Sequence, residues 1–237
     1  MPTDSAAIDL THHFLIAMPG LEDDLFARSV VYVCEHSARG ALGLIINKPS
    51  DLPLAGLFEK IALQLHRDDL TDAPVFRGGP IQTERGFVLH APMGQGGESV
   101  YSSTLVIPGD GSGLKGVDWP NSEIHVALSV ETDDDDAAPS APPDAPKYGP
   151  ARLEMTTSKD VLEAMAEGAG PARVLVTLGY ATWGKGQLES ELAENAWLTV
   201  PADESIIFDT PPELRYSQAM GLLGLDAGML HGEAGHA

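Results

Sequence analysis

The chain has 237 residues, 43% of them hydrophobic, which is long and apolar enough for one sizeable core. It carries 35 Asp and Glu against 14 Lys and Arg, giving a formal net charge of −21. Nucleic acids and anionic membranes are bound through clustered cations, so this balance disfavours both as direct partners. The single cysteine, Cys34, excludes an internal disulfide and gives no indication of an oxidising compartment.

The N-terminal stretch lacks the basic start and the long apolar run of a signal peptide. No segment approaches the ~18 consecutive apolar residues that a membrane-spanning helix needs. We therefore expect a cytoplasmic protein that does not associate with a membrane.

Strands and turns alternate in the first half of the chain. A helix is predicted over 52–65, where apolar residues recur at helical spacing and Pro53 falls in the first turn. A short loop ending in Gly40 joins two β-rich runs, which predicts a hairpin. Apolar and β-branched runs predict strands over 14–20, 29–36, 41–49, 74–77, 86–90, 103–107 and 124–130.

The segment from Glu131 to Pro150 is acidic and rich in proline, and it includes four consecutive aspartates. It has little to bury, so we expect a disordered or surface-loop insertion within one domain that spans residues 1–237. A metal site is disfavoured, because adjacent aspartates on a flexible loop do not converge on one ion. The glycines over 109–113 lack the spacing of a dinucleotide-binding loop and predict another flexible loop.

The second half continues the mixed α/β pattern. Ser158 is a predicted N-cap and Gly168 a predicted end for one helix. Further strands are predicted over 151–155, 173–178 and 205–208, a second helix after Gly186, a final helix over 212–223, and a frayed tail over 226–237.

Cys34 and His36 form the sharpest catalytic candidate. Two residues apart on a predicted strand, they are expected to share one face with their Cα atoms roughly 7 Å apart. A nearby imidazole can draw a thiol toward thiolate, the form that acts as nucleophile or redox sensor. Free cysteine is also a common core residue, and Tyr32 shares the predicted face. We favour the buried alternative and assign no catalytic residue.

A near-match to the phosphate loop lies between residues 179 and 186. Gly179, Gly184 and Lys185 fit the pattern G-x-x-x-x-G-K, but Gly186 replaces the hydroxyl residue that holds magnesium. A tight structural turn between strand and helix explains more of these residues. A small-nucleotide site at this turn, or an anion held by free backbone N–H groups at the start of the following helix, remains an alternative.

Two further strings offer ligand-binding candidates. Arg77 and Arg85 flank a glycine pair in an acidic protein, so they are candidates to bracket an anionic ligand by charge-assisted hydrogen bonds. Pairing of each with a carboxylate is the favoured alternative. The candidate ligand-binding residues are Asn47, Lys48, Arg77, Gly78, Gly79, Arg85, Gly184 and Lys185.

The histidines are scattered, and His231 and His236 lack the spacing of two zinc ligands on one helix. We therefore expect neither a metal site nor a cofactor.

Taken in order, the strings FLIAMPG, SVVYVCEHSARGALGLIINKP, RGGPIQTERGFVLH, VTLGYATWGKGQLESELAENAWL and ADESIIFDTP resemble the YqgE/AlgH family of bacterial proteins from about Phe14 to Leu225. The resemblance implies a compact mixed α/β fold, with a branched sheet and a small barrel-like part surrounded by helices. It brings no settled activity, cofactor or catalytic set, although some members are implicated in regulating exopolysaccharide (alginate) production. The matching residues are Cys34, Glu35, His36, Asn47, Lys48, Pro49, Gly78, Gly79, Pro80, Arg85, Gly86, Gly179, Tyr180, Trp183, Gly184, Gln187 and Leu188.

Two features depart from the family pattern. Lys185 stands where relatives often have proline, and the segment 131–150 looks like an expansion of a short connection. Together these observations favour a non-enzymatic regulatory protein that binds a protein or small-molecule partner, acting on any transcriptional process indirectly. The alternatives are a thiol enzyme or redox sensor using Cys34 and His36, and a small-nucleotide binder at the Gly179–Gly186 turn.

Overall fold

The structure is a computed structural model, and it describes residues 9–93, 99–102, 104–108 and 151–225. The predicted strand over 124–130, the glycine loop at 109–113, the acidic insertion and the tail lie outside these residues.

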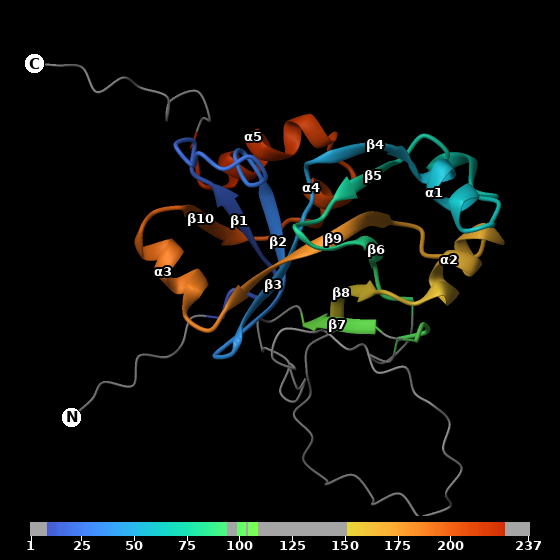
Figure 1. Ribbon diagram of the computed structural model, residues 1–237, viewed down its shortest axis with the longest axis horizontal. Coiled ribbons are helices and arrows are strands. Elements are labelled where there is room, and N and C mark those ends of the chain that lie inside the picture. The colour runs from blue at the N-terminus through green and yellow to red at the C-terminus, as the bar shows by residue number, and fades with distance from the viewer. Residues whose placement is uncertain (1–8, 94–98, 103, 109–150, 226–237) are drawn as a thin grey trace, which may run out of the picture.

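Strands and helices are interspersed along the chain, which gives a mixed α/β fold (Figure 1). The strands are β1 (His13–Ala17), β2 (Val30–Ser37), β3 (Gly40–Ile45), β4 (Pro49–Pro53), β5 (Pro74–Arg77), β6 (Ile81–His90), β7 (Thr104–Pro108), β8 (Ala151–Thr156), β9 (Val174–Gly184) and β10 (Trp197–Pro201). The helices are α1 (Leu54–Lys60), α2 (Lys159–Ala166), α3 (Gln187–Ala193), α4 (Glu204–Phe208) and α5 (Pro212–Leu222), with a 3₁₀ turn at Asp68–Leu70.

All the strands belong to one curled and branched sheet. Its main path runs in the order β10-β1-β2-β3-β9-β6-β8-β7, with neighbours antiparallel. The branch leaves at β9, which pairs in parallel with β5, and β5 in turn pairs with β4. The branched mixed sheet expected from the sequence is therefore present, and the predicted hairpin is the β2–β3 pair.

The longest strand, β9, crosses the molecule and joins its two halves (Figure 1). Its first part pairs with β6, and its last residues pair with β3, with Gly184 opposite Gly40. The chain bends at Gly179, where φ is +72°. The predicted tight turn between strand and helix is present, but it lies at residues 185–186, because glycine at position 179 lets the strand continue to Gly184.

Three groups of buried side chains fill the space between the sheet and the helices. The first includes Phe14, Tyr32 and Cys34 and extends to α4 and α5. The second lies under α3 around Trp183 and Trp197, whose rings meet edge to face with centroids 6.0 Å apart. The third joins α1 and α2 to β5, β6 and β9.

Two other local predictions are corrected by the structure, and one further strand was missed. Residues 205–208 lie in α4, because Asp203 caps a helix by accepting a hydrogen bond from the Ser205 N–H at 2.9 Å. The helix predicted over 52–65 covers Leu54–Lys60 alone, since β4 takes the residues before it and Ala62 adopts a φ of 58°. The strand β10, which pairs with β1, was not predicted.

Candidate functional site

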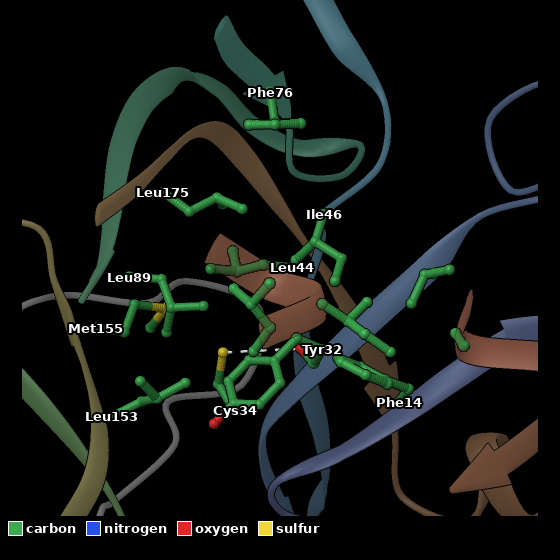
Figure 2. Close-up of a cluster of buried hydrophobic side chains, with 14 of the residues drawn as sticks. Phe14, Tyr32, Cys34, Leu44, Ile46, Phe76, Leu89, Leu153, Met155 and Leu175 are labelled. Carbon is green, nitrogen blue, oxygen red and sulfur yellow. Dashed lines mark hydrogen bonds between the residues drawn. The ribbon is translucent and has the colours of Figure 1, made fainter. Parts of the chain in front are cut away.

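Cys34 lies in the first buried cluster, with 0% of its surface exposed (Figure 2). Its Sγ contacts the Tyr32 carbonyl oxygen at 3.8 Å. Burial, reinforced by the charge of Glu35, raises the pKa of the thiol well above its ordinary value. The thiol therefore stays protonated near neutral pH, which makes it a poor nucleophile.

A β-bulge separates Cys34 from His36. Val33 pairs with Gly43 on β3, and the next pairs are Glu35 with Leu42 and His36 with Ala41. Cys34 and Leu42 belong to the first buried cluster, whereas Ala41 belongs to the second. Because paired residues point to the same side of a sheet, His36 faces away from the thiol. The prediction that the two side chains share one face is wrong, because the bulge inserts one residue into β2.

His36, on the opposite side of the sheet from Cys34, connects β2 with α3 and with the segment before β1. Its Nδ1 accepts a hydrogen bond from the Leu10 N–H at 3.1 Å, and its Nε2 lies 3.2 Å from Glu189 Oε1 on α3. These contacts hold the start of α3 and the segment before β1 against β2.

The turn before α3 is closed by its own side chains. Lys185 is exposed, and Gly186 takes a left-handed conformation with φ of 75° as the N-cap of α3. The Gly184 N–H donates to Gln187 Oε1 at 3.0 Å. The Gly184 N–H is thus occupied by the side chain of Gln187, and α3 has 7 residues.

The strings NKP and RGG, which are separate in the sequence, meet in the structure. The Arg77 N–H donates to the Lys48 carbonyl at 2.8 Å, and the Ile45 N–H donates to the Gly78 carbonyl at 2.9 Å. Asn47, next to Lys48, accepts a hydrogen bond through Oδ1 from the Val30 N–H at 2.8 Å. The predicted candidates Asn47, Lys48, Arg77, Gly78 and Gly79 therefore lie together.

The glycines of the RGG string pass against the bend of β9. A Cβ at Gly78 would lie 2.6 Å from Thr177 Oγ1 and closer still to the Gly179 carbonyl oxygen. A Cβ at Gly79 would meet the backbone of Tyr180. The two backbones therefore approach at a distance that excludes side chains, which fixes this crossing rigidly.

Three cations gather beside this crossing. Arg28 lies over the Tyr216 ring, with its Cζ 5.0 Å from the centroid. Lys48 Nζ donates to the Ala27 carbonyl at 2.6 Å, and Arg215, which is 5% exposed, donates from Nη1 to the Ile46 carbonyl. We call Arg28, Lys48, Arg215 and Tyr216 the basic junction.

Burial acts on two cations of the basic junction, and Lys48 is also repelled by Arg28. Burial, together with the charge of Arg28, lowers the pKa of Lys48. Burial lowers the pKa of Arg215 to about 10, and the charge of Glu213 offsets this in part. Within the described part of the chain, none of the three cations has a carboxylate oxygen within 4.0 Å. An anion placed here would relieve the repulsion between Lys48 and Arg28 and part of the burial penalty.

Arg77 and Arg85 do not face one ligand together. Val75, two residues before Arg77 on β5, lies in the third buried cluster, so the exposed Arg77 side chain leaves the sheet on that side. Arg85 lies 6.0 Å from the ring of Phe87, in the first cluster, and donates to Thr157 Oγ1 at 3.1 Å. The bracketing prediction is contradicted because the two side chains point to opposite faces of the sheet.

A second polar cluster, the His90–Glu154 cluster, lies where β6, β7 and β8 meet. His90 and Glu154 are 0% and 1% exposed, with Nε2 and Oε2 4.0 Å apart. Thr156 Oγ1 lies 3.0 Å from His90 Nε2 and 2.8 Å from Thr104 Oγ1. Ser99 Oγ donates to Glu154 Oε2 at 2.9 Å. Burial lowers the pKa of His90, although Glu154 opposes that shift.

Sequence reasoning missed the partners that complete both clusters. Arg215 carries a usable signal, since it shares the buried helix face of Ala219 and a cation on an apolar face needs an explanation. Glu154 carries a similar one, because it lies between Leu153 and Met155 in an apolar strand. Arg28 carries none, since no local pattern places it beside Tyr216.

Among the described residues, no group of three or more His, Cys, Asp or Glu is placed to hold a metal ion. Across the same part of the chain, each helix is too short or too polar to cross a bilayer.

The sequence and the fold match proteins of one family. The AlgH-like family profile matches residues 14–228. UPF0301 proteins of Paracidovorax citrulli and Polaromonas sp. are 60% and 57% identical over 238 and 237 residues, and both alignments cover 100% of each chain.

Solved structures give the same picture. The solution structure of the AlgH protein from Pseudomonas aeruginosa is 40% identical, with a TM-score of 0.63 and 98% of each chain covered. An X-ray structure of a Corynebacterium diphtheriae protein is 19% identical, with a TM-score of 0.55, and covers 89% of this chain and 85% of its own. The second likeness concerns the fold alone.

Proposed function

This chain belongs to the AlgH-like family, and from its geometry we propose that it acts by binding a partner or a small ligand in a regulatory role, without turning over a substrate. The observation that carries the proposal is the basic junction. It gathers cations without carboxylate partners beside a rigid backbone crossing, which suits recognition of a negatively charged group.

The placement of Cys34 supports the same proposal. A thiol enzyme or sensor needs an accessible, activated thiol, but Cys34 is buried and His36 faces the other side of the sheet. No observation in the structure favours a nucleotide site at Gly179, because β9 runs through that position as a strand.

The regulatory part of the proposal follows from the family, some of whose members are implicated in exopolysaccharide production. With a net charge of −21, the chain would act on such a process through other proteins in the cytoplasm. Salt-sensitive, sequence-specific binding of DNA by the purified protein would contradict this indirect route.

The test of a non-enzymatic role is an assay of the purified protein against chromogenic carboxylate esters, phosphate esters and glycosides. We expect no steady turnover. Steady turnover that is abolished by one point substitution would overturn the proposal. Native mass spectrometry of the same preparation would identify a ligand that co-purifies.

The thiol alternative has its own test. We expect a thiol-specific chromogenic reagent to leave Cys34 unmodified in the folded protein and to label it fully in denaturant, because the thiol is buried and protonated. Stoichiometric labelling of the folded protein within seconds at neutral pH would instead favour a thiol enzyme or sensor.

A further inference from the structure

We propose that the basic junction is an oxyanion-binding site that takes the phosphate group of a small molecule or free inorganic phosphate. This inference rests on the binding role proposed above and specifies the chemical class of the ligand.

A closed chain of contacts brings the three cations together from distant parts of the sequence. Lys48 reaches back to the carbonyl of Ala27, the residue before Arg28. Arg28 lies on the ring of Tyr216, and the neighbouring Arg215 reaches the Ile46 carbonyl, two residues before Lys48. The three charges are therefore held by the ends of β2 and β3 and by α5, as one local cluster.

The basic junction differs from the other cationic sites in that neighbouring cations lack carboxylate partners. Elsewhere in the described chain, some cations meet carboxylates, as Arg173 does with Asp209 at 2.7 Å, and others, such as Arg85, do not. In the basic junction, Lys48 and Arg28 lie close enough to repel each other. In a chain with 35 acidic residues, a carboxylate partner is easily available. Three cations that lack one have a stronger attraction for an external anion than cations already neutralised.

Hydrogen-bond donors remain available at the basic junction. Lys48 has three N–H groups, and one donates to the Ala27 carbonyl. Arg215 uses Nε for the Thr210 carbonyl at 2.9 Å and Nη1 for the Ile46 carbonyl, and its guanidinium lies over the Phe76 ring, so it contributes mainly its charge. The exposed guanidinium of Arg28 donates to no described residue. Several charge-assisted donors around a doubly charged, multi-oxygen group favour phosphate over a single carboxylate.

The overall charge limits the size of the ligand. At −21, the chain repels extended polyanions, so a long phosphate backbone gains less here than a compact one. A small phosphate ligand contacts the local cations while staying away from the surrounding carboxylates, so it is repelled less than a long polyanion.

The experiment titrates the full chain with inorganic phosphate and, separately, with phenyl phosphate, at constant ionic strength set with sodium chloride. Binding is followed by thermal unfolding and by amide chemical shifts. We expect both phosphates to raise the melting temperature relative to chloride alone, because a ligand that binds the folded state stabilises it. Amide shifts should concentrate around Arg28, Lys48 and Arg215.

Two variants and one control locate the effect. Arg28→Gln and Lys48→Gln should each weaken phosphate binding about tenfold or more, the loss expected for one charge-assisted contact. Lys185→Gln removes an exposed lysine from the turn before α3, outside the basic junction, and should bind as the original chain does. Arg215 is left intact because it anchors α5 to the core.

The outcomes separate the ligand sources and the two proposals. Tighter binding of phenyl phosphate would identify a phosphorylated small molecule, and equal or weaker binding would identify free phosphate. No stabilisation beyond chloride, or stabilisation that survives in both variants, would overturn the oxyanion site. That result would leave the general binding role standing, since the role falls instead to steady turnover of a substrate.

Discussion

The basic junction and the His90–Glu154 cluster both contain buried ionisable groups, but these groups have different interaction partners. In the His90–Glu154 cluster, both ring nitrogens of His90 and one carboxylate oxygen of Glu154 meet partners, as with Thr156 on His90 and Ser99 on Glu154. In the basic junction, cations meet backbone carbonyls and the aromatic rings of Tyr216 and Phe76, with no carboxylate within 4.0 Å in the described chain.

The difference distinguishes a structural polar cluster from a binding surface. A buried network whose members satisfy one another stabilises a single arrangement of strands and has little to gain from a ligand. Neighbouring like charges with no carboxylate in contact keep a free-energy penalty that an external anion can remove. We therefore assign structure to the His90–Glu154 cluster and recognition to the basic junction.

The largest effect on stability is expected at Gly78, where the RGG string passes against β9 beside the basic junction. Gly78→Ala places a Cβ against the Gly179 carbonyl and 2.6 Å from Thr177 Oγ1, so the crossing must open. We expect a loss of about 3 kcal/mol or more in the free energy of unfolding. Denaturant titration measures it. Gly86→Ala is the matched control, because a Cβ there meets nothing within 4 Å, and equal losses in the two variants would contradict the rigid crossing.

The next effect tests whether the His90–Glu154 cluster is closed. Glu154→Ala removes the acceptor of Ser99 and leaves polar groups unpaired in a buried site, which should cost about 2 kcal/mol. Glu163→Ala breaks an exposed pair with Lys159 and should cost under about 1 kcal/mol. Urea unfolding of both variants provides the comparison. A loss at Glu154 no larger than at Glu163 would show that the cluster is not structural.

A smaller effect depends on pH. Burial lowers the pKa of His90 in the folded state below its ordinary 6.5. Between these two pKa values, the imidazole is protonated in the unfolded chain and neutral in the folded chain. The stability due to neutral His90 is present above pH 6.5 and is lost as the pH falls toward the folded-state pKa, by at most about 1.4 kcal/mol per pH unit.

The variant His90→Gln isolates this effect, since glutamine does not titrate. We expect the difference in free energy of unfolding between the original chain and the variant to shrink as the pH falls from about 7.5 to 5. Urea unfolding across that range measures it. A difference that stays constant or grows on acidification would show that the folded state accepts the proton as readily as the unfolded state.

The smallest effect on stability is expected at the surface of the basic junction. Arg28→Gln removes the repulsion between Arg28 and Lys48, which stabilises the folded state. It also removes the contact with the Tyr216 ring, which destabilises the folded state, so the two effects oppose each other. We expect the free energy of unfolding to change by less than about 0.5 kcal/mol in low-phosphate buffer. A large destabilisation in thermal and urea unfolding would mean that the basic junction is as structural as the His90–Glu154 cluster.

Local patterns predicted much of the fold. Alternating and β-branched runs located β1, β2, β3, β5 and β8, and the expected N-cap Ser158 immediately precedes α2. Short apolar runs were predicted least well. The run over residues 205–208 is compatible with a strand or a helix, and the cap at Asp203 favours the helix. The candidate site was predicted in part, since Asn47, Lys48 and the RGG string meet, whereas Arg28 and Arg215 were missed.

The sequence by itself determined the family, the mixed α/β character and the positions of most elements, because hydrophobic periodicity and turn residues act over a few residues. Only the tertiary structure decided the bulge that separates Cys34 from His36 and the continuation of β9 through Gly179, since both depend on pairing with a distant strand. The basic junction is also tertiary. Its charges come from residues 28, 48 and 215, and electrostatic energy depends on their distance in space, which no local pattern encodes.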